Sequence, residues 1–161
     1  MAIMSSRLIR HEICKDELKK MGAKVFDIQG IMFYVKFVID GVKIYYMYHL
    51  REDNTFRLER IKPYTMPIGE FTTEEDVVDL IKIDIEQFKQ AMRSSNFEKF
   101  VDVDNNIARL VRVFEDLYLY YNIPKEDLKL INDEVDTILK TILDIKGHSE
   151  RVYFKKEPES F

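Results

Sequence analysis

Apolar and polar residues alternate between about residues 24 and 62, and apolar residues recur at helical spacing on both sides of this region. The alternation predicts four strands, over residues 24–29, 31–39, 42–51 and 55–62. The helical spacing predicts one helix before the strands, ending near residue 21, and three helices after residue 72. An N-terminal helix, a four-stranded antiparallel meander and three C-terminal helices together make an α+β fold.

The last two predicted helices are joined by the short connection 122–124. A connection of this length makes the two helices antiparallel neighbours. We therefore expect their apolar stripes to pack on each other, with Leu110, Phe114 and Leu117 against Val135, Ile138 and Ile142. Residues 1–147 are predicted to form a single α+β domain, and residues 148–161 a polar, mobile C-terminal tail.

The register of the predicted sheet follows from its turns. Asp40 and Gly41 accept the positive φ angles of a two-residue hairpin turn, which pairs Phe33 with Tyr48 and makes every pair on that face apolar or aromatic. A three-residue loop at 52–54 then keeps Leu58 on the same face, whereas a two-residue turn would turn charged residues inward. This face is therefore the predicted core face.

The opposite face of the predicted sheet mixes aromatic, methionine and charged side chains. The candidate ligand-binding or partner-binding residues on it are Asp27, Met32, Tyr34, Tyr45, Met47, His49, Arg57 and Glu59. Such a face is too apolar to stand in water and too charged for an ordinary core.

Three explanations of this mixed face remain open. The first helix or the tail covers it, a partner protein or a second copy of the chain covers it, or it binds a small ligand. We expect Tyr34, Tyr45 and Met47 to be shielded from solvent, with another molecule contributing to the shielding.

A second candidate surface lies on the third predicted helix, in the run from Tyr118 to Tyr121. Tyr118 belongs to the apolar stripe, while Leu119 and Tyr120 point elsewhere, so the helix is more apolar than one core requires. We expect Tyr118, Leu119 and Tyr120 to contribute to an interface, and homodimerisation is the simplest outcome.

Composition narrows the possible partners and compartments. A net charge of −4 and a pI near 5.5 argue against general nucleic-acid binding, which relies on clustered Lys and Arg. No apolar run approaches the roughly 20 residues that a membrane span needs. The single Cys14 cannot form an internal disulfide, which favours a reducing compartment. These features together predict a soluble cytoplasmic protein.

Motifs for catalysis or cofactor binding are not found in the sequence. It lacks a nucleotide-binding glycine pattern, a zinc-protease motif and a serine nucleophile elbow, and its three histidines have no ligand spacing. The sequence therefore predicts no cofactor or metal and favours a non-catalytic module that binds a protein or associates with itself. The alternative is a small-ligand protein or enzyme in which Arg57 holds an anion and His49 acts as general base.

Overall fold

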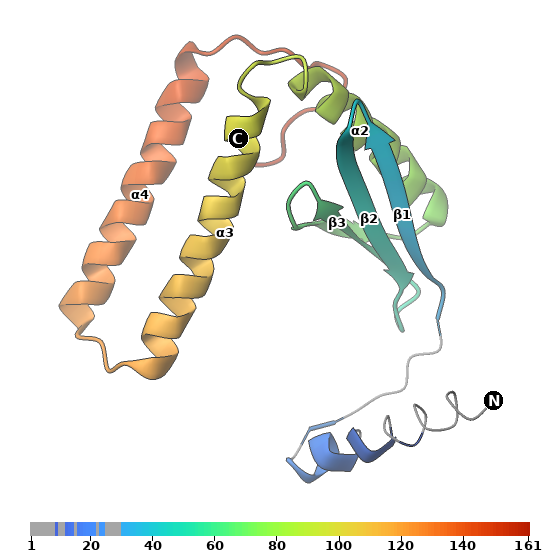
Figure 1. Ribbon diagram of the computed structural model, residues 1–161, viewed down its shortest axis with the longest axis vertical. Helices are drawn as coiled ribbons and strands as arrows, with labels where there is room; N and C mark the ends of the chain where they lie inside the picture. The colour runs from blue at the N-terminus through green and yellow to red at the C-terminus, as the bar shows by residue number, and fades with distance from the viewer. Residues whose placement is uncertain (1–8, 10–11, 15, 22, 25–29) are drawn as a thin grey trace.

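Four antiparallel strands follow one another in both sequence and sheet order. They are β1 (Met32–Ile39), β2 (Val42–Leu50), β3 (Phe56–Lys62) and β4 (Met66–Phe71), followed by the helices α2 (Glu74–Ala91), α3 (Phe97–Tyr120) and α4 (Lys125–His148). The computed structural model describes residues 9, 12–14, 16–21, 23–24 and 30–161. Residues 9, 12–14 and 16–20 are helical. The predicted α+β order is confirmed (Figure 1).

The predicted register of the first two hairpins is also confirmed, except at Tyr45, where a bulge shifts the pairing by one residue. Asp40 and Gly41 have φ angles of 49° and 80°, as a two-residue turn of this kind requires. Phe33 faces Tyr48 across β1 and β2, and Tyr48 faces Leu58 across β2 and β3. The next loop has the predicted three residues, since the amide of Arg51 bonds to the carbonyl of Thr55 at 2.8 Å.

The fourth strand differs from the prediction. Strand 24–29 was expected to complete the sheet, but Lys24 has no regular structure and residues 25–29 lie outside the described residues. The described sheet is instead completed by β4, which follows Pro63 and contains Pro67. Pro67 is compatible with β4 because β4 is an edge strand, and a bulge between Leu58 and Glu59 adjusts the pairing there.

The core lies between one face of the sheet and α2, which crosses that face (Figure 1). Its buried members are Ile44, Tyr46, Tyr48 and Leu58 from the sheet and Val77, Ile81, Ile85 and Phe88 from α2. Phe33 was expected to join them but is 45% exposed. It lies on the core face and stacks on Tyr48, but β1 is an edge strand, so no further strand flanks it within the described sheet.

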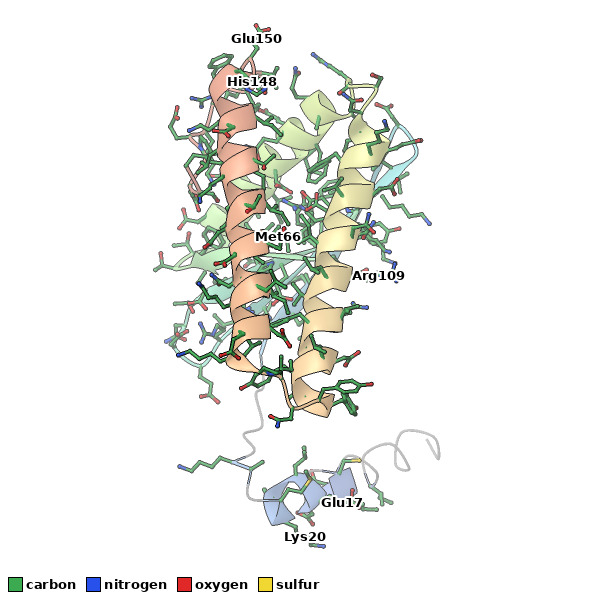
Figure 2. The ribbon with its side chains drawn as sticks, turned by 90° about the vertical axis from the view of Figure 1, so that its left-hand side faces the viewer. Glu17, Lys20, Met66, Arg109, His148 and Glu150 are labelled. Atoms are coloured by element: carbon green, nitrogen blue, oxygen red, sulfur yellow. The ribbon has the colours of Figure 1, made fainter. Side chains whose placement is uncertain are left out.

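Helices α3 and α4 form an antiparallel hairpin that stands beside the sheet and α2, and Figure 2 shows the two helices side by side in front of the sheet. The direction of the two helices agrees with the prediction, but the predicted packing of their stripes does not. Neither helix has a buried residue, and Phe114 and Ile138 remain 39% and 48% exposed. The two apolar stripes therefore do not bury each other within a single chain.

Candidate functional site

The register gathers the predicted outer-face residues on the sheet surface that faces away from α2. The first cross-strand row is Met32, His49 and Arg57, and the second is Tyr34, Met47 and Glu59. Asp27 lies outside the described residues. The third row departs from the expected pairing because a bulge between Tyr45 and Tyr46 sets Tyr45 opposite Lys62 instead of Ile61.

The polar groups of this outer face pair with one another. Arg57 donates from Nε to Glu59 Oε1 at 2.9 Å. Tyr34 and Tyr45 meet edge to face with their ring centroids 5.9 Å apart, and Lys36 Nζ lies over both rings at 5.2 and 5.5 Å. The negative charge of Glu59 beside Arg57 offsets the charge with which Arg57 would hold an anion, so this pairing disfavours the role that the ligand-binding hypothesis assigns to it.

The outer face is only partly shielded by the described chain. Tyr45 and Met47 are half-buried, but Tyr34 is 52% exposed, so the described chain does not shield Tyr34 by itself and the expected contribution of another molecule stays a prediction. In the described part of the first helix, apolar side chains such as Ile13 and Leu18 are themselves exposed. The larger cavities of the described chain are lined by other residues. The face therefore offers a contact surface without enclosing a ligand.

A buried ion pair, which sequence reasoning missed, joins the sheet to α2. Arg60 on β3 and Asp84 on α2 are each 7% exposed. Arg60 donates from Nη2 to Asp84 Oδ1 at 2.6 Å and from Nε to Asp84 Oδ2 at 3.0 Å, and Tyr46 donates its hydroxyl to Oδ2 at 2.6 Å. The forked geometry and the third donor satisfy the carboxylate, as a buried charge pair requires.

The pKa shifts of this network follow from its burial. Burial, the hydrogen bond to Asp84 and the negative charge of Asp84 raise the pKa of Tyr46 far above its ordinary value. Burial by itself would lower the pKa of Arg60, but the hydrogen bonds and charge of Asp84 outweigh it and raise that pKa. Tyr46 therefore remains a neutral donor and Arg60 a cation, which makes the network a fixed structural link rather than a proton-transfer site.

A cavity of about 150 Å³ lies beside this ion pair. The guanidinium carbon of Arg60 stands 4.7 Å from the ring centre of Phe88 and 5.1 Å from that of Tyr64. Asp104, from α3, is near enough for Arg60 to lower its pKa, although burial raises that pKa by more. Since Asp84 already occupies two donor atoms of Arg60, the cavity lacks a free charge with which to select an anion.

Tyr48 makes a second hydrogen bond from the sheet to α2, donating to Glu74 Oε1 at 2.7 Å. Burial, with help from this bond, raises the pKa of Tyr48 to about 12. An unfolded tyrosine loses its proton near pH 10. Between about pH 10 and 12 the unfolded chain thus releases a proton that the folded chain keeps, so stability present below pH 10 is lost as the pH rises.

The Tyr48→Phe variant is expected to reduce this alkaline loss of stability. Its free energy of unfolding should fall less steeply than that of the wild type between about pH 10 and 12, by the contribution of one proton, while Tyr46 keeps its own contribution. Urea unfolding at a series of alkaline pH values measures the slope. An unchanged slope would show that Tyr48 titrates alike in the folded and unfolded chains.

The α3–α4 hairpin carries a long series of exposed apolar side chains. Its apolar residues recur at alternating spacings of three and four, the heptad pattern of helices that pack in bundles. We call the following twelve residues the hairpin stripe: Phe100, Val103, Ile107, Leu110, Phe114 and Leu117 on α3, and Leu128, Ile131, Val135, Ile138, Ile142 and Ile145 on α4. Nine of them are exposed and the other three are half-buried.

The predicted interface residues extend this surface near the loop end of α3. Tyr118 is 60% exposed and Tyr120 is more exposed still, and with Val111, Val113 and Leu139 they flank the hairpin stripe. Leu119 is also exposed but lies on the opposite side of α3 from the stripe, by its place in the heptad. The structure thus joins Tyr118 and Tyr120 to one surface and leaves Leu119 outside it.

The start of α3 contacts α2 and the segment before β4, and the tail that follows α4 returns to α2. At the start of α3, Phe97 meets Phe88 with ring centroids 6.3 Å apart, and Phe100 meets Tyr64 at 5.6 Å. After α4, the tail returns to α2, where Lys155 Nζ lies 2.7 Å from Glu86 Oε2. The loop end of the hairpin has no comparable attachment among the described residues.

Metal and membrane sites are not evident in the described part of the chain. No group of three or more His, Cys, Asp or Glu side chains there could hold a metal ion. Among the same residues, none of the helices combines the length and the apolar character needed to cross a bilayer.

Comparison of the chain with protein-family models, with curated proteins and with solved structures gives no match.

Proposed function

We propose that the protein is a non-catalytic interaction module that packs helices of another polypeptide against the hairpin stripe. The observation that supports this proposal most strongly is the stripe itself. It runs along two helices of 24 residues, and none of its members is buried. The outer sheet face, with its paired charges and no enclosing cavity, gives less support to the alternative of a ligand-binding protein.

The physical reason is the cost of leaving such a surface in water. The largest apolar patch of a typical monomer is about 300–600 Å², and larger ones mark binding sites. Full burial of a large apolar side chain contributes about 1.5–3 kcal/mol, which at about 25 cal/mol per Å² corresponds to roughly 60–120 Å². Fourteen exposed residues of the stripe and its flanks, each about half exposed, therefore present roughly 400–800 Å².

The kind of partner follows from the pattern of the stripe. A heptad stripe is shaped to interdigitate with other helices rather than with strands or a flat surface. Tyr118 and Tyr120 widen it at the loop end, and tyrosine is among the residue types enriched at interfaces. The module is thus expected to bury α3 and α4 in a helical bundle with its partner.

Hydroxyl-radical footprinting of the intact protein over a dilution series tests this proposal. Phe114 and Tyr118 should be oxidised in the most dilute, unassociated chain, whereas the core residues Tyr46 and Phe88 should stay protected at every concentration. The Leu110→Glu variant provides a dissociated reference at every concentration. Protection of Phe114 and Tyr118 in that variant at the highest dilution would mean that the chain buries its own stripe, and the proposal would fail.

A further inference from the structure

We infer that the partner of the hairpin stripe is a second copy of this chain, and that two hairpins close a four-helix bundle around a two-fold axis. The inference rests on the proposed function, because it names the occupant of the same surface. Its supports are the exposure of the stripe along its length, the area of the surface and the polarity of its residues.

The exposure of the stripe is that of one half of a bundle. In a four-helix bundle every helix turns its apolar stripe toward a common axis, so a hairpin without the other half of its bundle leaves its stripes exposed along their length. No residue of the hairpin stripe is buried, and the most exposed, Val103, reaches 57%. Partial exposure persists from the first heptad of α3 to Ile145, near the end of α4.

The area of the surface matches what a stable dimer buries. A standard interface takes about 800 Å² from each partner, and in homodimers about 65% of the interface is apolar. The required apolar area is then roughly 500 Å² per copy, which lies within the roughly 400–800 Å² that the stripe and its flanks present. One further copy is therefore sufficient to cover the surface.

The chemistry of the surface favours a copy of the same chain over a different partner. All twelve positions of the stripe are apolar, so none carries a polar group that would select a foreign sequence or register. The hairpin between residues 97 and 148 has eleven acidic and seven basic residues. The two signs alternate along the sequence of the hairpin, and a two-fold axis covers both stripes at once.

Sedimentation equilibrium of the full chain over a range of concentrations tests this inference. The wild type should form a dimer, and Leu110→Glu should weaken the association by at least about a hundredfold, because each copy would carry an unpaired charge into the bundle. Leu130→Glu is the matched control. It places the same charge on an exposed leucine of the same hairpin outside the stripe, and should leave the association unchanged.

The two proposals fail in different ways. A wild type that stays monomeric while footprinting shows an accessible stripe would overturn self-association and leave the interaction module standing. A monomer with a protected stripe would overturn both. A dimer that Leu110→Glu does not weaken, or that Leu130→Glu weakens equally, would place the interface elsewhere and overturn the inference. Circular dichroism and urea unfolding of each variant verify that the core between the sheet and α2 is intact.

Discussion

Asp84→Ala is expected to lower the free energy of unfolding by about 3–5 kcal/mol, the usual cost of removing one partner of a buried ion pair. The substitution leaves Arg60 buried among Phe88 and Tyr64 without its counter-charge. It also leaves the hydroxyl of Tyr46 without its acceptor. Urea denaturation followed by far-ultraviolet circular dichroism measures the loss.

Asp79→Ala provides the control for this variant. Asp79 lies on the same helix and pairs with Lys82 at 2.9 Å, but both side chains are about two-thirds exposed. Exposed pairs of this kind contribute about 0.3–0.5 kcal/mol. Equal losses in the two variants would mean that Arg60 finds water or another acceptor once Asp84 is removed, and that the pair does not hold the sheet to α2.

Leu58→Ala is expected to lower the free energy of unfolding by about 2–5 kcal/mol, through lost burial and the cavity left behind. Leu58 is 0% exposed and lies on a central strand, in contact with the core that α2 completes. The same urea experiment measures the change. A loss near the top of this range would show that the surrounding side chains cannot collapse into the space.

Leu130→Ala is the matched control, because it removes the same atoms from a leucine that is 60% exposed on α4. Its effect should stay within about 0.5 kcal/mol. Phe33→Ala is expected to fall between the two, since Phe33 stacks on Tyr48 but remains half exposed. A loss for Phe33→Ala as large as that for Leu58→Ala would mean that β1 is covered in solution.

The register of β1, β2 and β3 could be predicted because two turns determine it. Asp40 and Gly41 adopt positive φ angles, and Asn54 at 61° closes a three-residue loop. Once these turns are placed, a shift of one residue would bring charged side chains into the core, so only one register remains. The bulge at Tyr45 could not be predicted in the same way. The alternation of apolar and polar residues along the two strands gives no sign of the one-residue shift there.

The ion pair could have been found from that same register. Continuing the pairing of Tyr48 with Leu58 by two residues places Arg60 opposite Tyr46, on the core face. Asp84 lies between Ile81 and Ile85 on the apolar side of α2. Buried charges are normally paired, so opposite charges at core positions of two different elements suggest an ion pair between them. Sequence spacing alone does not show that the two side chains meet.

The packing of α3 and α4 could not be derived from the sequence for a different reason. A heptad stripe specifies that apolar side chains meet those of another helix, but it does not specify whether that helix belongs to the same chain. The short connection 122–124 determines the antiparallel direction. It does not determine how closely Leu110 and Ile138 approach. The strand β4 escaped prediction because proline is compatible with edge strands as well as with loops.

The contacts that the start of α3 and the returning tail make with α2 have a consequence for how the protein can change in evolution. Phe88 and Glu86 hold the beginning of α3 and the returning tail within one turn of α2. The sheet and α2 therefore do not depend on how far the hairpin extends. Lineages can lengthen or shorten the hairpin in steps of seven residues on each helix, which keeps the stripe in phase. The apolar area of the hairpin stripe can then change while the core between the sheet and α2 stays constant.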